Sequence, residues 1–174
     1  MKKLIVLIGL FSYIQIVAQT DASIIKVDFQ IKNAGITVDG HFDSIQAQLY
    51  FKKNKWESAS ISGKVYAKTI KTGIALRDKH LINDDYFDTE TYPFITLNSI
   101  SLKEAKKGEL TGKFNLRVKE TTQLVEIPIT YTQNGKSIVL KGQFSINRQE
   151  FGVGGDSFVL ADDVLILFEA TFPK

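Results

Sequence analysis

Apolar and polar residues alternate at every second position through most of this 174-residue sequence. In the segment 57–66, serine and lysine alternate with four small or apolar residues, Ala59, Ile61, Gly63 and Val65. Successive side chains of a β-strand point to opposite faces of a sheet, so a period of two predicts strands with one dry and one wet face. The alternation therefore predicts an all-β protein.

Comparable runs cover residues 25–31, 36–51, 110–118, 125–131, 138–146 and 164–172, and the run 94–102 is strand-like but less cleanly two-faced. With 36–51 taken as one bent strand, the chain has about eight strands, the number at which a closed barrel encloses packed side chains or one small ligand. Closure also removes exposed sheet edges. We expect an antiparallel β-barrel with an apolar interior, while a packed β-sandwich would show the same alternation.

Short turn motifs separate the runs, as antiparallel hairpins require. Asn134-Gly135 is the clearest, because this dipeptide favours the two-residue turn of a hairpin, and residues 33–35, 52–55 and 106–108 supply further turns. The lysines in these turns are expected to serve solubility. Pro128 lies inside a strand run and cannot donate a ladder hydrogen bond, which predicts an edge, a bulge or an unpaired position there.

One region, about 72–88, departs from the alternation. Ile74, Leu81 and the polar residues between them fit helical spacing. Thr72 can cap the N-terminus of this helix, and Pro93 forces the chain back into an extended conformation. The sequence thus predicts a short helical insertion between two groups of strands.

The first 19 residues have the pattern of a cleaved signal peptide. Lys2 and Lys3 precede an apolar stretch from Leu4 to Phe11, and cleavage after Ala18 or Gln19 would follow a small residue. A membrane anchor is the alternative, but polar residues interrupt the apolar run before it reaches the ~20 residues needed to span a bilayer. We therefore expect residues 1–19 to be removed and residues 20–174 to fold as one domain in the periplasm or outside the cell.

Composition excludes several classes of function. The chain contains no cysteine and only two histidines, His41 and His80, which excludes disulfides, thiol nucleophiles, thiolate zinc sites and a histidine-rich metal site. The formal net charge is +3, and Lys2 and Lys3 belong to the leader. A nearly neutral mature protein lacks the positive field that nucleic-acid binding needs. We expect no metal, no cofactor and no nucleic acid.

The predicted helix carries the strongest candidates for catalysis. His80 could act as a general base oriented by a carboxylate, with a hydroxyl as nucleophile. However, Asp78 and His80 are two residues apart on the helix and so point to different sides. We favour a structural role for Arg77 and Asp78, through capping and ion pairing that fix the helix to the barrel, and keep a hydrolase that uses His80 as an alternative.

Two loops carry weaker signals. The acidic residues between 84 and 90 lack the spacing of a calcium-binding loop, so a solvated loop is expected there. The glycines of 151–156 follow a strand without opening a helix, which favours a long loop at the barrel end. Arg148, beside that loop, could meet a lipid phosphate or a quinone oxygen, with an ion pair to Asp78 or Asp163 as the alternative.

Several short motifs occur together in the order and spacing of a known family. They are Gly40-His41-Phe42, Ile70-Lys71-Thr72-Gly73, Arg77-Asp78-Lys79-His80-Leu81, Asp85-Tyr86-Phe87-Asp88, Tyr92-Pro93, Leu110-Thr111-Gly112, Phe144 to Gly152 and Asp162-Asp163-Val164. On these motifs, nearly the whole mature chain resembles the YceI-like family. It departs from the family at Tyr86, where phenylalanine is common, and at Lys119 to Thr122, where a Gly-Val-Thr turn is common.

The resemblance implies a lipocalin-like antiparallel β-barrel, exported to the periplasm, whose elongated apolar pore holds a polyisoprenoid or a similar long-chain lipid. It implies a binding protein and not an enzyme. We therefore expect sequestration of a polyisoprenoid, an isoprenoid quinone or a similar long-chain apolar ligand, with transient membrane contact, and leave a homodimer open. The alternative from another class is an envelope barrel with a filled core that acts in protein–protein contact.

The strand runs also assign candidate site residues. Those expected to face inward and line the cavity are Phe29, Ile61, Val65, Leu97, Phe114, Leu116, Ile129, Phe144, Ile146, Ile166 and Phe168. Candidate head-group contacts at the mouth are Arg148, Arg77 and His80.

Overall fold

The computed structural model describes residues 19–52 and 55–174. The predicted signal peptide lies outside these ranges except for Gln19, and so do Lys53 and Asn54 of one predicted turn. Within the described ranges, no helix is long and apolar enough to cross a membrane.

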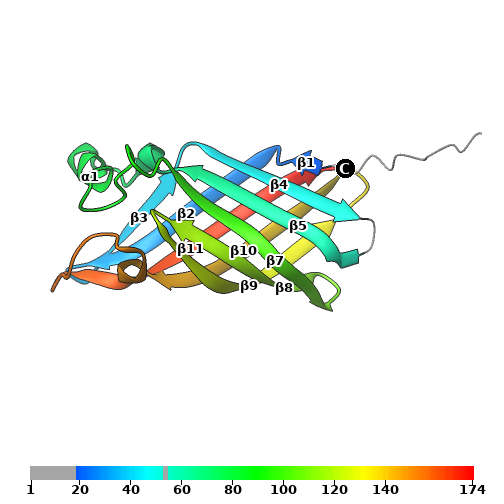
Figure 1. Cartoon of the computed structure of the whole chain (residues 1–174). Helices are drawn as coiled ribbons and strands as arrows, with labels where there is room; N and C mark the ends of the chain where they lie inside the picture. Colours follow the sequence, from blue (N-terminus) through cyan, green and yellow to red (C-terminus); the bar gives the residue numbers. More distant parts are fainter. Residues whose placement is uncertain (1–18, 53–54) are drawn as a thin grey trace, which may run out of the picture.

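Eleven β-strands form most of the described chain, as the alternation predicts (Figure 1). Their bounds are β1 Gln19–Asp21, β2 Ile24–Asn33, β3 Ile36–Phe42, β4 Ile45–Lys52, β5 Lys55–Tyr66, β6 Ile70–Lys71, β7 Phe94–Lys106, β8 Glu109–Val118, β9 Thr121–Gln133, β10 Ser137–Asn147 and β11 Leu160–Pro173. The count exceeds the expected number of about eight for two reasons. The bent segment divides at Asp43 into β3 and β4, and β1 and β6 are only three and two residues long.

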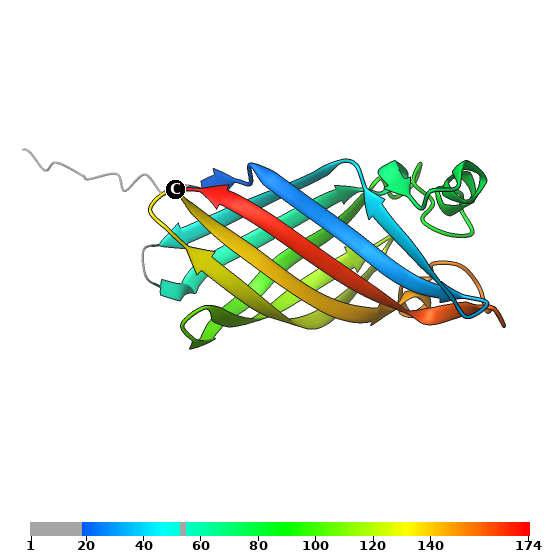
Figure 2. The ribbon, with the colours of Figure 1, turned by 180° about the vertical axis from the view of Figure 1, so that it is seen from behind.

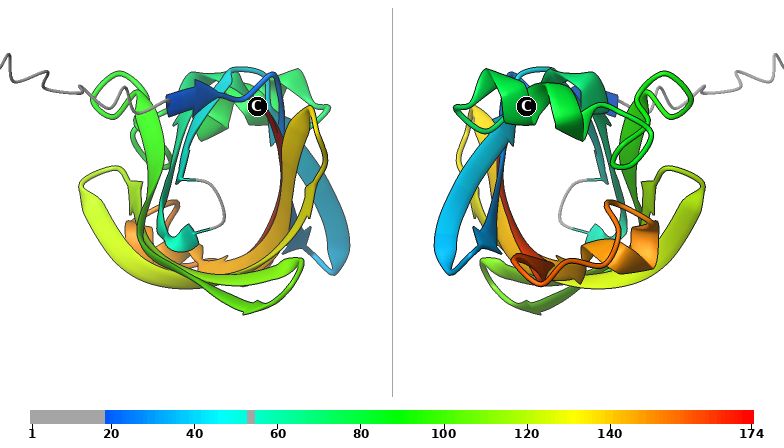
Figure 3. Two further views of the ribbon diagram at one scale, coloured as in Figure 1. Left: turned by 90° about the vertical axis from the view of Figure 1, so that its right-hand side faces the viewer. Right: turned by 90° about the vertical axis from the view of Figure 1, so that its left-hand side faces the viewer.

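All eleven strands belong to one antiparallel sheet with the order β1-β4-β5-β7-β8-β9-β10-β11-β2-β3-β6. The sheet curls until its two sides meet, because β3 pairs with β2 while β4, which continues the same bent segment, pairs with β5. At one end β1 pairs with β4, and Ser23 N donates to Thr171 O of β11 at 2.8 Å. β11 and β2 run side by side along the back of the molecule (Figure 2), and the end-on views show the barrel that results (Figure 3). The predicted antiparallel barrel is confirmed.

Three of the predicted hairpin turns are present. Asn134-Gly135 joins β9 to β10, and Asn134 Oδ1 accepts hydrogen bonds from the N–H groups of Lys136 and Ser137 at 2.8 and 2.9 Å. Ala34-Gly35 joins β2 to β3 with φ angles of 50° and 80°, the left-handed region in which glycine is favoured. Lys107-Gly108 joins β7 to β8.

The helical insertion is shorter than predicted. Helix α1 spans Ala75–Leu81, whereas helical structure was expected over about 72–88. Residues 82–92 form a series of turns, held by hydrogen bonds such as Asp88 N to Asn83 O at 2.8 Å. Two short 3-10 turns complete the fold, η1 at Ala67–Thr69 before β6 and η2 at Arg148–Phe151 between β10 and β11.

β9 and β10 separate partway along the wall. β9 pairs with β8 over Thr121 to Thr130, and β10 pairs with β11 over its whole length. Between β9 and β10, however, the pairing ends at Ile129 opposite Gly142, one residue from Pro128. The prediction of an unpaired position at this proline is confirmed on the side that faces β10.

Candidate functional site

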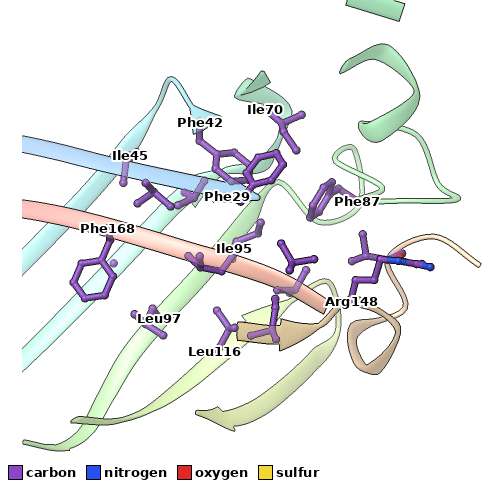
Figure 4. A pocket seen from close by; sticks show the side chains of 18 of the residues that line it. Phe29, Phe42, Ile45, Ile70, Phe87, Ile95, Leu97, Leu116, Arg148 and Phe168 are labelled. Carbon is purple, nitrogen blue, oxygen red and sulfur yellow. The ribbon is translucent and has the colours of Figure 1, made fainter. Parts of the chain in front are cut away.

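A cavity of about 560 Å³ lies inside the barrel and reaches the end that carries α1 (Figure 4). Most of the side chains around it are apolar. Its wall contains all eleven residues predicted to face inward, which come from β2, β5 and β7 to β11: Phe29, Ile61, Val65, Leu97, Phe114, Leu116, Ile129, Phe144, Ile146, Ile166 and Phe168. Their contact with a ligand stays a prediction.

Glycines opposite phenylalanines make room for aromatic rings along this wall. Phe29 lies opposite Gly40 in the β2–β3 pair, and Phe168 lies opposite Gly142 in the β10–β11 pair. A Cβ atom at Gly40 would lie 2.1 Å from Phe29 Cζ, and one at Gly142 would lie 2.6 Å from Phe168 Cζ. Each ring therefore lies across the neighbouring strand instead of extending along the barrel radius, which leaves the axis open.

The end of the barrel opposite α1 is filled by side chains. Trp56 is 3% exposed and packs between Phe51 and Tyr131, with ring centroids 4.4 and 4.8 Å apart. The core around it is made of Leu49, Leu102, Leu110, Phe114, Ile127, Ile129, Ile138, Leu140, Ala170 and Phe172. This packing blocks the barrel at that end, so the route to the cavity along the axis runs through the end with α1.

α1 and the loop 152–159 surround the mouth of the cavity. Ile74, Leu76 and Val159 belong to the cavity wall and are also exposed, at 53%, 65% and 58%. Ile36 and Phe158 are exposed at the same end, where Ala34 N donates to Val159 O at 2.7 Å. The apolar lining thus continues from the cavity onto the outer rim.

Arg77 and His80, two of the three candidate head-group contacts, lie in the wall near this mouth. Nε and Nη2 of Arg77 donate to Oγ1 and O of Thr72 at 2.7 and 2.6 Å. These two bonds orient the guanidinium but leave Nη1 outside them. His80 is exposed on α1, so both side chains remain candidates for contact with a polar head group.

Thr72 does not cap α1 as expected. The N-cap residue is Ile74, and no side chain caps the helix there. Instead, N and Oγ1 of Thr72 donate to Oδ1 of Asp78 at 2.8 and 2.5 Å. The carboxylate reaches back across the first turn and closes the segment 72–78 on itself, which fixes α1 to the end of β6.

Arg148, the third candidate head-group contact, also lies in the cavity wall, but its guanidinium is bound within the protein. Its side chain is 4% exposed. Four of its N–H groups donate at 2.9 to 3.4 Å to backbone carbonyl oxygens of the loop after η2 and of the start of β11, those of Val153, Gly155, Leu160 and Ala161. The fifth donates to Asp162 Oδ1 at 2.9 Å, so all five guanidinium donors are used inside the protein. The ion pair forms with Asp162 and not with Asp78 or Asp163.

The β8–β9 turn, where the sequence departs from the family motif, contacts both rim segments. Lys119 has a φ of 53°, in the region that favours glycine, and its Nζ donates to Gly152 O at 3.0 Å. The neighbouring carboxylate of Glu120 raises the pKa of Tyr92 above its ordinary value, through hydrogen bonding and, to a lesser extent, its charge. The turn therefore links the helical insertion to the loop that follows η2.

The acidic residues of 84–90 form part of the turn-rich rim. The carbonyl of Asp85 accepts a hydrogen bond from Gly154 N at 2.9 Å, which joins this segment to the loop after η2. Among residues 19–52 and 55–174, no group of three or more His, Asp or Glu side chains is placed to hold a metal ion.

The cavity wall also contains residues that the sequence analysis did not single out. Some continue the alternating runs and could have been found by the same pattern, namely Ile25, Val27, Ile31, Val38, Leu140 and Val164. Others come from the short strand β6, the turns and the insertion, namely Ile70, Tyr86, Phe87, Phe151 and Val153. A period of two does not apply in those segments, so only a three-dimensional structure places them.

Comparison with known proteins gives a consistent result. Residues 19–172 match the family described as the YceI-like domain. A UPF0312 protein of Pseudomonas fluorescens is 30% identical over 138 residues, which cover 72% of this chain and 70% of that protein. Another UPF0312 protein, from Vibrio cholerae, is 21% identical over 178 residues, which cover 91% of this chain and 94% of that protein.

Two solved structures share the fold. The crystal structure of Burkholderia cenocepacia BcnA superposes with a TM-score of 0.81 at 26% identity, over 84% of this chain and 95% of that one. A polyisoprenoid binding domain from Saccharophagus degradans, implicated in plant cell wall breakdown, superposes with a TM-score of 0.74 at 13% identity, over 90% of this chain and 98% of that one. At such low identity, the second likeness concerns the fold alone. Because the family match covers almost all of the described residues, the chain belongs to the YceI-like domain family.

Proposed function

We propose that this chain is an exported carrier that sequesters a polyisoprenoid, an isoprenoid quinone or a similar long-chain apolar ligand in the barrel cavity. The observation that carries the proposal is the cavity of about 560 Å³, whose apolar wall is blocked at the end around Trp56 and continues at the other end onto the rim. The fold of a polyisoprenoid binding domain, which this chain shares, supports the same ligand class.

The driving force for binding is removal of the ligand chain from water. Each buried methylene contributes roughly 0.8 kcal/mol, and the ordering of the chain offsets part of this gain. A wall of Val, Ile, Leu and Phe side chains offers few partners for polar atoms along the ligand. An unbranched or isoprenoid tail with its polar end left at the mouth fits that distribution.

The polar end of the ligand is proposed to lie between Arg77 and His80. Both residues are in the cavity wall at the mouth, and Nη1 of Arg77 lies outside the two hydrogen bonds that orient the guanidinium. A quinone oxygen or a phosphate would accept a hydrogen bond from such a donor. Arg148 is not part of this contact, because its donors are used within the protein.

Export and membrane contact belong to the same proposal. The pattern of residues 1–19 supports cleavage and a periplasmic or secreted location. An insoluble ligand has to be collected from or delivered to a lipid phase, and the exposed rim residues Ile36, Leu76 and Phe158 are suited to contact with a bilayer. The cavity speaks against a fully packed core, the alternative in which the barrel acts only through protein contacts.

The experiment is a binding measurement with an obstructed cavity. Purified protein is incubated with a long-chain polyprenol or with ubiquinone, separated from free ligand by gel filtration, and extracted for quantification. Val65→Trp places an indole in the cavity wall, and Ser60→Trp on the exposed face of the same strand β5 is the control. We expect binding by the wild type and the control and at least tenfold less by Val65→Trp. Equal binding by both variants, or none by the wild type, would overturn the proposal.

A further inference from the structure

The seam between β9 and β10 interrupts the hydrogen bonding of the barrel wall. From Ile129 and Gly142 towards the mouth, these two strands share no backbone pairing, while each remains paired with its other neighbour, β8 or β11. Backbone hydrogen bonds are what hold the rest of the wall closed. In the seam, this role falls to side chains.

η2 and the residues after it fill the seam. Phe151 and Val153 are 2% and 8% exposed and pack into one cluster with residues of β8, β9 and β10, namely Leu116, Val118, Val125, Phe144 and Ile146. In both end-on views, η2 (orange) lies beside the bend of β8 and β9 (yellow-green) (Figure 3). Phe151 also belongs to the cavity wall, so this ring stands between the cavity and the seam.

The two sides of η2 are attached very differently. On the side of β10 and β11, the chain is continuous, Arg148 binds Asp162, and Gln149 Nε2 donates to Asp162 Oδ1 at 2.7 Å. Away from β10 and β11, two polar contacts hold the segment: Lys119 Nζ donates to Gly152 O at 3.0 Å, and Gly154 N donates to Asp85 O of the insertion at 2.9 Å. A single hydrogen bond from a lysine at this rim competes with water, so breaking it costs little.

The backbone after η2 contains two glycines that permit movement. Gly152 and Gly154 have φ angles of 62° and 68°, and glycine can leave the left-handed region for other conformations at little steric cost. They flank Val153, whose N–H and carbonyl are bonded to O and Nη1 of Arg148 at 3.1 and 2.9 Å, so Val153 moves together with η2. A firmly attached side, a weakly attached side and flexible positions next to the buried residues are the parts of a hinged cover.

We propose that η2 is such a cover: release of Gly152 by Lys119 and of Gly154 by Asp85 lets η2 move as a unit with Phe151 and Val153, which leave the seam and open a side passage from the cavity between β9 and β10. A long apolar chain could then leave sideways, without being withdrawn along its whole length through the mouth. The passage of ligand rests on the proposed function. The opening of the cover does not depend on that function.

Thiol labelling tests the opening without any ligand. The chain has no cysteine, so Val153→Cys and Ala170→Cys each create one thiol at a buried position, 8% and 6% exposed in the parent residues. Ala170 lies on β11 in the packed end and also borders the cavity, so it reports entry of reagent through the mouth or by global unfolding. We expect a maleimide to label Val153→Cys at least tenfold faster than Ala170→Cys.

The role of the Lys119–Gly152 bond is tested by adding Lys119→Met to each cysteine variant. Lys113→Met, on the exposed face of β8, is the control for loss of charge. Lys119→Met is expected to raise the labelling rate of Val153→Cys severalfold and to leave Ala170→Cys unchanged. Equal labelling rates of the two cysteines would contradict the proposed cover. So would a labelling rate of Val153→Cys that Lys119→Met does not change.

Exchange kinetics then test its use. Dissociation of cis-parinaric acid, a fluorescent long-chain fatty acid, into phosphatidylcholine vesicles is followed by stopped flow. We expect Lys119→Met to raise association and dissociation rates by the same severalfold factor with Kd unchanged, because a cover changes the barrier and not the bound state. A change in Kd alone contradicts the side passage. If the wild type binds no probe, the proposed function fails, while the labelling result still decides whether the cover opens.

Discussion

The ring of Phe29 lies across Gly40 of the neighbouring strand, so close that a Cβ atom at Gly40 would lie 2.1 Å from Phe29 Cζ. The two residues are direct partners in the β2–β3 pair. Gly142 and Phe168 repeat the relationship in the β10–β11 pair. Glycines at inward positions therefore determine where aromatic rings lie and how much of the barrel axis stays open.

Replacing Gly40 by alanine is expected to be destabilising. The new methyl group would overlap the ring of Phe29, which is buried and has to shift into the cavity or push β3 outward. Overpacking of this kind costs about 1–3 kcal/mol. Urea unfolding measures the change, with Gly135→Ala as control because no atom lies within 4 Å of a Cβ at that turn position. Equal stability of the two variants would contradict the close approach.

Loss of Arg148 should destabilise the protein more than loss of its ionic partner. Arg148→Leu removes the donors of four backbone carbonyls at once, and a free energy of unfolding lower by about 3 kcal/mol is expected. Asp162→Asn keeps an acceptor at a side chain that is 45% exposed, so a loss of about 1 kcal/mol or less is expected. Chemical unfolding of both variants compares them, and a larger loss for Asp162→Asn would show that the ion pair dominates.

The bond between Tyr92 and Glu120 makes a pH-dependent contribution. Hydrogen bonding to Glu120 raises the pKa of Tyr92 in the folded protein, so the folded state holds the phenolic proton more tightly than the unfolded state. The stabilisation is fully present below the unfolded-state pKa of about 10 and is lost as the pH rises through the higher folded-state pKa.

We expect Glu120→Ala to return the pKa of Tyr92 towards its ordinary value. The phenolate absorbance of each protein, minus that of its Tyr92→Phe counterpart, isolates this one tyrosine from the six in the chain. An unchanged titration in Glu120→Ala would mean that the rim contact is absent in solution.

The rim residues are expected to carry membrane contact. Burial of Leu76 and Phe158 in a bilayer would contribute about 1.5–3 kcal/mol each, so Leu76→Ser with Phe158→Ser should weaken binding to phosphatidylcholine vesicles at least tenfold. Ile100→Ser with Leu124→Ser is the control, because these two side chains are 57% and 63% exposed on β7 and β9. Co-sedimentation measures both. A similar loss in the two double variants would point to general hydrophobicity and not to the mouth.

Much of the barrel wall could be predicted because the side-chain period of a strand is independent of its neighbours. Once the runs around Ile61 and Phe144 are recognised as strands with one apolar face, burial fixes which face is inward. The same rule does not extend past the strands. Phe87 and Phe151 reach the cavity from turns whose path depends on hydrogen bonds between distant segments, such as Gly154 N to Asp85 O.

The hydrogen-bond and ion-pair partners of single polar residues also could not be predicted from the sequence. Arg148 and Asp162 meet because the loop between them folds back over the guanidinium, and nothing local distinguishes Asp162 from Asp163. Pro128 did signal the interrupted pairing with β10. Its consequence, a seam filled by Phe151, depends on η2 and is visible only in the structure.

The cavity is proposed to hold one long-chain apolar ligand. Native mass spectrometry of the protein purified gently from its own host, with the Val65→Trp variant treated in the same way, tests this directly. We expect a wild-type mass above that of the polypeptide by the mass of one lipid, which solvent extraction releases and identifies, and a variant that carries little or none. A wild-type protein that carries only its polypeptide mass, or a lipid retained equally by Val65→Trp, would contradict it.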